Sequence, residues 1–423
     1  MSTSMKTTQI LKPILDGGVR SVNFFNGRLL TGEDLTREQQ ANREWLARLG
    51  RLAGEGVAGG LTVAPIADKP SVTVSPGVAM NALGQTLRLV DPFEVSLLRP
   101  AGTPDDTPTA PASPVPGFAD CLPPESGIYR TGSGVYLLTI APATGVEGSV
   151  PTNGLGNLVA SCATRFLVDA VQFRLYSLTF AFGAELFEAD RLRNAVAGRC
   201  FGVANAGAFI TDPFGLPPAS ARLLDALGKK LPPTDVPLCV LNWTSTGGIA
   251  FIDHWSVRRR PAGPPDELVW SPALGERRVA DAEAMLLQFQ DHLDALADGV
   301  PEPIVAKDHF DYLPPAGVMP LGGTPGFRGF LPSVFFQGLK IRDPIYIEGA
   351  RVEALLRRAL RFPPMKVPSE EMLWVYHVRE NAYKADGHDG ARVQPYAIFA
   401  SGQIPYAGEA VFDVAHWDYA SFS

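Results

Sequence analysis

Cysteine is scarce in this chain, and the cysteines present are widely spaced. Only 4 of the 423 residues are cysteine, and no two of them form a CxxC unit. The sequence therefore signals neither a zinc site nor a redox pair. We expect reduced, structural thiols in a chain made in the cytoplasm. The four residues are Cys121, Cys162, Cys200 and Cys239.

Charge and long apolar runs are also in short supply. Charged residues make up 19 % of the chain, where about 25 % is usual. The net charge is −7 and no long basic tract occurs, which argues against nucleic acid as the main partner. No stretch approaches the roughly 18 uninterrupted apolar residues of a membrane-spanning helix. The polar N-terminus lacks the apolar segment of a secretory signal.

Glycine and proline, in contrast, are abundant. The 42 glycines and 38 prolines form about 19 % of the chain, where about 12 % is usual. This excess indicates many turns and short elements, while 46 % hydrophobic residues can still fill cores. We expect a mainly β, α+β chain of several domains, built from antiparallel sheets or β-sandwich-like units with short helices.

The first 98 residues are predicted to form a helix with a small β-sheet behind it. Thr31 offers a helix N-cap, and a helix over residues 35–52 ends at the glycines that follow. Alternating apolar residues then predict half-buried antiparallel strands around residues 71–80 and 85–90.

One face of this helix carries a series spaced like the seam of a coiled coil. Polar residues at such positions cost stability but fix register and oligomeric state. We interpret the series as an oligomerisation surface, with a helix packed on its own domain as the alternative. The predicted oligomerisation residues are Leu35, Gln39, Asn42, Leu46 and Leu49.

Composition shifts divide the rest of the chain. Strands are predicted at 134–141, 164–168, 171–180, 236–243, 249–253, 373–378, 396–400 and 410–414, and helices at 184–197, 219–228, 278–296 and 348–361. The predicted units are 1–98 for docking and oligomerisation, 99–125 as a proline-rich linker or long loop, 126–262 as a β-rich central domain with short helices, 263–300 as a connecting helix, and 301–423 as a C-terminal β-rich domain with a basic helix.

No motif for catalysis, a cofactor or a metal is found. The histidines make no HExxH unit, and neither a GxSxG elbow nor a Walker A loop occurs. An enzyme acting on a polysaccharide would need Asp253 with His254, or Asp386 with His388 and Asp389, to meet another carboxylate in one cleft. We expect no catalytic, cofactor-binding or metal-ligating residues.

Basic and aromatic clusters are candidates for partner contact. Arginines in a run can meet an acidic surface, or can be a polar face beside acidic neighbours. Aromatic residues near the C-terminus are of the type enriched at protein interfaces and can also stack on sugar rings. The candidate contacts are Arg258, Arg259, Arg260, Trp417 and Tyr419.

The opening of the chain resembles a module of phage-tail-like proteins. The likeness rests on Asn23-Phe-Phe-Asn-Gly-Arg-Leu-Leu-Thr-Gly-Glu-Asp, the helix after it, Gly-Gly-Leu-Thr-Val and Val72-Thr-Val-Ser-Pro-Gly-Val-Ala. It covers about 70 of the 423 residues. The segment that the resemblance marks as a docking motif contains Phe24, Phe25, Gly27, Arg28, Leu29 and Leu30.

This resemblance implies a structural role without catalysis. We associate the module with contractile injection systems and tailed phages, as a baseplate-peripheral, adaptor, plug or tail-fibre-like virion component. It implies an oligomer, with a trimer favoured, that contacts other tail or baseplate subunits in an assembled particle. The alternatives are a module binding carbohydrate or a cell-surface glycan on such a particle, and a polysaccharide-degrading enzyme.

Overall fold

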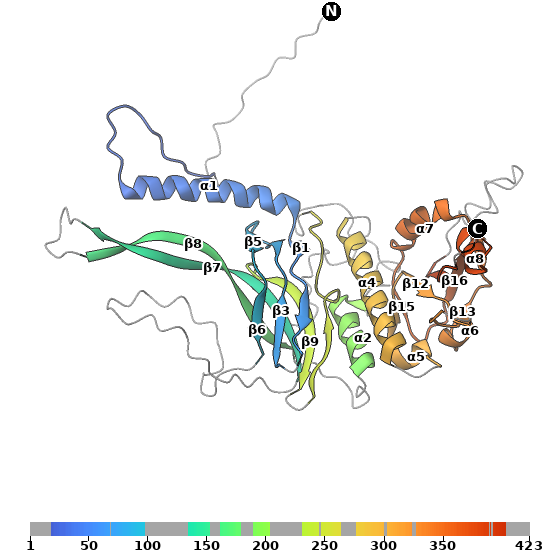
Figure 1. Ribbon diagram of the computed structural model, residues 1–423. Helices are drawn as coiled ribbons and strands as arrows, with labels where there is room; N and C mark the ends of the chain where they lie inside the picture. The colour runs from blue at the N-terminus through green and yellow to red at the C-terminus, as the bar shows by residue number, and fades with distance from the viewer. Residues whose placement is uncertain are drawn as a thin grey trace, which may run out of the picture.

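The computed structural model (Figure 1) describes most of the chain in separate ranges. They are 18–67, 69–97, 134–152, 161–178, 189–203, 231–244, 247–263, 276–299, 303–323, 327–388, 390 and 392–402. The predicted linker at 99–125, the helix at 219–228 and the strand at 410–414 lie outside these ranges.

The N-terminal unit is one long helix followed by six short strands. The strands form two antiparallel sheets, in the orders β1-β4-β5 and β2-β3-β6, where one sheet was predicted. Pro76 separates β3 from β4, because proline cannot donate to a ladder. The elements are α1 (Gly32–Ala53), β1 (Gly56–Gly60), β2 (Val63–Pro65), β3 (Ser71–Val74), β4 (Gly77–Met80), β5 (Thr86–Leu89) and β6 (Phe93–Ser96).

A four-stranded antiparallel sheet in the order β10-β9-β7-β8 forms the centre of the molecule. Its strands are β7 (Gly134–Thr152), β8 (Ser161–Leu178), β9 (Val236–Thr244) and β10 (Gly248–Asp253). The two strands predicted at 164–168 and 171–180 are wrong as separate elements. They form one strand, because β8 pairs with β7 without a register shift from Leu178 to Ser161.

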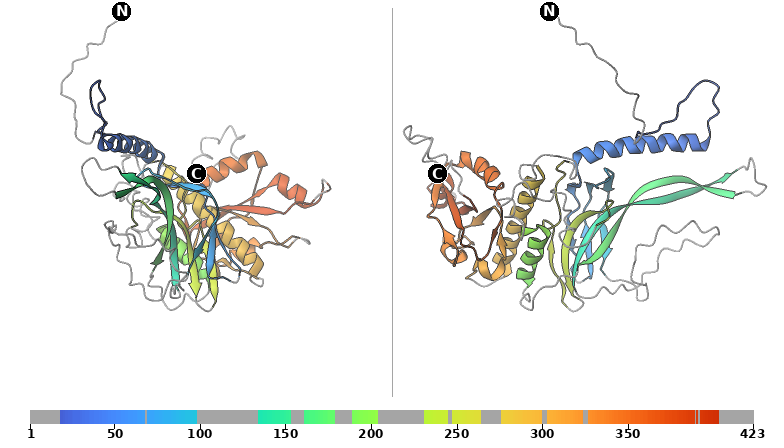
Figure 2. Two further views of the ribbon diagram at one scale, coloured as in Figure 1. Left: turned by 60° about the vertical axis from the view of Figure 1, so that its left-hand side comes forward. Right: turned by 180° about the vertical axis from the view of Figure 1, so that it is seen from behind.

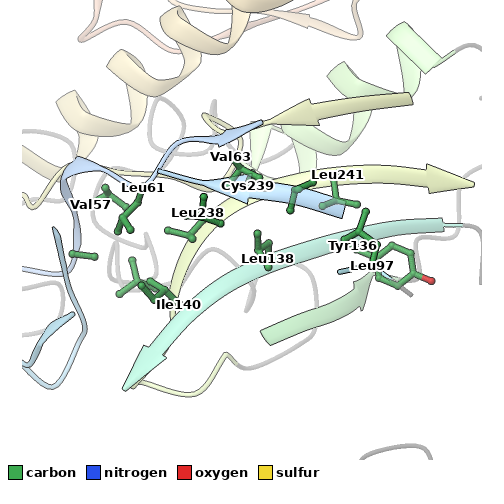
Figure 3. Packing of buried hydrophobic residues seen from close by; sticks show 14 of the residues in the cluster. Val57, Leu61, Val63, Leu97, Tyr136, Leu138, Ile140, Leu238, Cys239 and Leu241 are labelled. Carbon is green, nitrogen blue, oxygen red and sulfur yellow. The ribbon is translucent and has the colours of Figure 1, made fainter. Parts of the chain in front are cut away.

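The N-terminal sheets and the central sheet share one hydrophobic core (Figure 3). Leu61, Val72 and Leu87 from the first unit pack with Leu138 and Leu241 of the central sheet, all fully buried. Burying a side chain of this size contributes about 1.5–3 kcal/mol. The segments before and after the boundary predicted near residue 98 therefore pack around a single core.

One helix covers the other face of the central sheet, and a second helix lies beyond it. α2 (Ala189–Cys200) packs Val196 and Cys200 against that face. α4 (Glu276–Gly299) lies beyond α2 (Figures 1 and 2) and directs Phe289 and Leu293 into the core of the C-terminal unit. The helix predicted over residues 278–296 is thus confirmed. It is an internal layer of the molecule between two β-rich regions.

The C-terminal unit is built around a mixed sheet in the order β12-β17-β16-β13, with β14 also on β16. β13 and β14 run parallel to β16, whereas β12 and β17 are antiparallel neighbours. Its elements are α5 (Ala306–His309), β11 (Tyr312–Leu313), β12 (Ala316–Pro320), α6 (Pro332–Phe335), β13 (Lys340–Ile341), β14 (Ile345–Ile347), a 3₁₀ turn (Gly349–Arg351), α7 (Val352–Ala359), β15 (Met365–Lys366), β16 (Met372–Val378), α8 (Arg379–Ala385) and β17 (Tyr396–Ala400).

The fold is therefore mainly β with several helices, as predicted. Most sheets are antiparallel, and the parallel pairs on β16 are the exception. The two longest helices are those predicted over residues 35–52 and 278–296, since α1 has 22 residues and α4 has 24. The described cysteines, Cys200 and Cys239, are buried free thiols. Burial raises the pKa of the Cys200 thiol to about 12.

Candidate interaction surface

Capping residues determine where α1 begins. The Asp34 amide donates to Thr31 Oγ1 at 3.2 Å, and the Thr31 amide donates to the Asp34 carboxylate at 3.2 Å. These reciprocal bonds form a capping box. The Thr31 hydroxyl, 3.0 Å from the Asp34 carboxylate, and the Thr31 amide lower the pKa of Asp34, and the Arg28 guanidinium at 2.6 Å adds to the effect. At the other end the helix stops at Gly54, whose φ of 86° suits glycine.

The predicted docking motif forms the segment that leads into α1. The Arg28 guanidinium donates to the Asn23 carbonyl at 2.8 Å and to Asp34, and so draws the loop onto the first turn of the helix. Four large apolar side chains of the loop are exposed at the N-terminal end of α1, the end away from β1 (Figure 1). They are Phe24, Phe25, Leu29 and Leu30.

The C-terminal half of α1 rests on the turn between β4 and β5. A Cβ at Gly50 would collide with the carbonyl of Gly84, and a Cβ at Gly84 with that of Ala47. The two backbones therefore touch. Asn81 ties the turn to the central unit, because its Nδ2 donates to the Thr234 carbonyl at 3.2 Å. These contacts fix the direction in which α1 leaves the body.

The predicted oligomerisation residues lie on the exposed surface of α1. Leu35, Leu46 and Leu49 are 52 %, 66 % and 63 % exposed, and Gln39 and Asn42 are exposed as well. The alternative, a helix that buries this face in its own domain, does not apply to the protomer. The buried residues of α1 are Asp34, Ala41 and Gly50.

A second exposed apolar surface was missed by the sequence analysis. β9 pairs with β7 only as far as Ile140, so β7 and β8 continue as a two-stranded ribbon (Figures 1 and 2). We call residues 142–152 and 161–171 the arm. Apolar side chains are exposed on it, namely Val146, Phe166, Leu167 and Val168. The apolar run 166–168 was the signal available in the sequence.

Arg258 holds segments of its own chain together. Its side chain is buried and donates to the carbonyls of Leu61, at 3.2 Å, and Gly60. Arg259 donates to the Asp281 carboxylate at 2.5 Å, and Arg260 to that of Glu283 at 2.6 Å. The predicted basic cluster thus joins the N-terminal unit, the central unit and α4.

Asp253 and His254, the first pair suggested for acid–base chemistry, make contacts that join elements of the fold. The buried Asp253 carboxylate accepts bonds from Arg193 at 3.2 Å and from Gln288 at 3.0 Å. His254 Nε2 lies 2.9 Å from the amide of Val63, and burial lowers its pKa. The two side chains therefore hold neighbouring elements of the fold together.

The remaining sequence candidates are only partly described. Asp386 and His388 are exposed, and the His388 ring stacks on Tyr383 at a centroid distance of 4.7 Å. Asp389, Trp417 and Tyr419 lie outside the described residues. Two aromatic residues of β16 are packed: Tyr376 is fully buried, and Trp374 is half-buried in the same cluster.

A small hollow of about 70 Å³, partly open to solvent, lies between β1, the start of β9 and α4. Its rim includes Asp235, Arg259 and Arg260. Asp235 accepts bonds from Arg174 and from the Tyr176 hydroxyl, both at 2.8 Å, and the two arginines are paired as described above. These three charges thus serve the chain itself rather than a ligand.

Neither a metal centre nor a membrane span is found in the part of the chain that the structure describes. No group of three or more His, Cys, Asp or Glu side chains is placed there to hold a metal ion. Among the helices described, none combines the length and the apolarity needed to cross a membrane.

Fold and surface thus define a multi-sheet α+β protein with an exposed helical stripe and a ribbon arm. No family model matches the chain, and no curated protein matches it. Among solved structures it is similar to one titled "Crystal structure of TssK", with 7 % identity and a TM-score of 0.22. The match covers 50 % of this chain and 54 % of that one, so it spans about half the length of each. A similarity at this level supports no inference.

Proposed function

We propose that this chain is a structural, non-catalytic subunit that assembles with copies of itself through α1. The observation that carries the proposal is the exposed stripe of Leu35, Leu46 and Leu49 on a helix held rigidly against its own body. Leaving such a stripe in water is unfavourable, at about 25 cal/mol for each Å² of apolar surface. A self-complementary contact between copies removes it.

The spacing of the stripe assigns the heptad positions. Gln39, Leu46 and Ala53 occupy a positions, and Leu35, Asn42 and Leu49 occupy d positions. Cyclic symmetry about an axis along the helices makes the copies parallel.

Charges at the flanking positions suit a parallel arrangement. Glu38 then falls at a g position and Arg43 at the e position that follows in the neighbouring helix. These positions form interhelical ion pairs in parallel coiled coils. Arg43 is well exposed in the protomer, so it is accessible to such a pair.

The particle in which this oligomer acts is proposed from the sequence. The likeness of about 70 residues near the start of the chain to a phage-tail-like module supports a subunit of a phage tail or contractile injection system, at its baseplate or periphery. The exposed docking-motif side chains lie next to the stripe and supply a surface for another subunit. A trimer is the oligomeric state we favour.

Light scattering after size exclusion tests the self-association. At low micromolar concentration we expect the wild type near 136 kDa, three times the 45.3 kDa of one chain. The double variant Leu46→Ser/Leu49→Ser removes two apolar members of the seam, and we expect it at the mass of one chain. Val90→Ser, which changes an exposed aliphatic residue outside α1, is the control and keeps the wild-type mass.

A wild type that runs at 45 kDa would contradict self-association through α1. So would a seam variant that keeps the wild-type mass. Far-ultraviolet circular dichroism of each variant verifies that the chain is still folded, since both leucines are largely exposed and their loss leaves the protomer core intact.

A further inference from the structure

The core face of the central sheet continues, uncovered, onto the arm. Tyr136, Leu138 and Ile140 point from β7 into the core shared with the N-terminal sheets. Side chains alternate along a strand, and β7 pairs with β8 in one register throughout. Val146 and its cross-strand partner Leu167 therefore lie on that same face, 71 % and 64 % exposed.

A two-stranded ribbon of this kind needs another surface to pack against. A two-stranded hairpin is marginally stable in water, and three strands or a packed helix are needed to stabilise it. Over residues 164–170 the side chains of β8 are exposed on both faces. The first half of β7 and the second half of β8 meet the requirement inside the shared core, whereas the arm does not meet it within the protomer.

The protomer's own α1 is held away from the arm. Arg43 and Asp169 join the two at 3.9 Å through side chains that are 64 % and 86 % exposed. α1 cannot move onto the arm without breaking its backbone contact with the β4–β5 turn, where Gly50 meets Gly84. The cover for the arm must come from elsewhere.

Heptad geometry identifies where it comes from. Arg43 and Gly50 occupy e positions, so the chain's own arm and body lie on the e side of α1. The g side carries Trp45 and Leu52, which are 55 % and 68 % exposed. In a parallel coiled coil the g side of one helix adjoins the e side of the next. Each copy therefore presents Trp45 and Leu52 to the flank on which its neighbour carries an arm.

We propose that the core face of each arm packs on the g side of α1 in the adjacent copy of this chain. Val146 and Leu167 would cover Trp45, and Arg165, on the same face of the arm, would add a second positive charge near Glu38. α1 is about 33 Å long at 1.5 Å per residue, and the eleven β7 residues of the arm span about 36 Å. Within one copy, α1 and the arm extend from the body in the same direction (Figures 1 and 2).

This inference rests on the coiled coil proposed above and adds a second layer of contact around it. Cysteine pairs between differently tagged copies test it. With Cys121 and Cys162 replaced by Ser in every copy, one copy carries Trp45→Cys and the other Leu167→Cys. We expect a covalent dimer of unequal tags after mild oxidation. Val168→Cys, on the opposite face of the arm, replaces Leu167→Cys in the control and gives no such dimer.

A parallel cross-link through Leu46→Cys reports the coiled coil alone. If that link forms while the Trp45→Cys and Leu167→Cys copies fail to join, the arm contact is refuted and the coiled coil stands. If neither forms, both proposals fail. If Trp45→Cys and Leu167→Cys join only when placed in the same chain, the arm is covered by its own α1 and the inference is overturned.

Subunit dissociation gives an independent readout. We expect Leu167→Ser to raise the dissociation constant of the oligomer about tenfold or more, because one large apolar side chain is lost at each arm contact. Val168→Ser should leave it nearly unchanged. Equal effects of the two substitutions would contradict a contact confined to the core face.

Discussion

The buried side chain of His292 makes this chain less stable at mildly acidic pH. Its ring is fully buried in α4 beside Phe310, and neither ring nitrogen has a hydrogen-bond partner. Burial, with smaller contributions from Arg193 and His309, holds its pKa well below the usual range. The folded chain therefore keeps His292 neutral where the unfolded chain takes up a proton. We expect His292→Leu to remove this acid sensitivity.

The size of the effect follows from proton linkage. With an unfolded-state pKa of about 6.5, the neutral ring costs less than about 0.1 kcal/mol of stability at pH 7.5 and about 1.4 kcal/mol at pH 5.5. The neutral His292 ring thus costs almost no stability above pH 6.5. The chain loses stability as the pH falls below that value. At neutral pH the leucine should add about 1 kcal/mol, because two unpaired buried nitrogens are removed.

Urea unfolding at pH 7.5 and pH 5.5 provides the measurement. Burial also lowers the pKa of His254 and His377, so both proteins lose stability on acidification. The wild type should lose about 1.4 kcal/mol more than His292→Leu. An equal loss in the two proteins would refute the reasoning, since it would mean that His292 is protonated without penalty in the folded chain.

Two further substitutions test the frame of the molecule. Gly84→Ala places a Cβ against the Ala47 carbonyl at a φ of +77°. It should lower the free energy of unfolding, measured by the same urea titration, by more than about 1 kcal/mol. Gly27→Ala, whose φ is +93° but whose Cβ would lie in open space, should lower it by less. Arg258→Met removes the donor of two backbone carbonyls and should cost about 2 kcal/mol. Arg260→Met, at an exposed ion pair, should cost under about 1 kcal/mol. Equal costs within either pair would contradict the assigned contacts.

The stripe on α1 was predictable because its determinants are local. Thr31 and Asp34 cap the helix within one turn, and the 3–4 spacing of Leu35, Leu46 and Leu49 needs only helical periodicity. The alternation that buries Val72 in the N-terminal sheets is equally local. Such features depend on neighbours a few residues away.

The arm and the arginine contacts depend on distant partners. Asp169 interrupts the apolar pattern of β8, and the strand continues there because β7 pairs with it. Gly145, Gly148 and Pro151 similarly make the end of β7 look like a turn. No local pattern could reveal that the guanidinium of Arg258 bonds to a carbonyl in another unit. The sequence thus predicted a basic cluster without its partners.

That bond also bears on the order in which the chain can fold during synthesis. Arg258 and Leu61 are 197 residues apart, and at about 5–20 residues per second the ribosome needs roughly 10–40 s to make the intervening segment. Leu61 and Val72 emerge early, but half of their core lies on β7 and β9. The core of the first hundred residues therefore stays incomplete, with its apolar side chains exposed, until the central sheet leaves the ribosome. During this interval the growing chain is most exposed to misassembly.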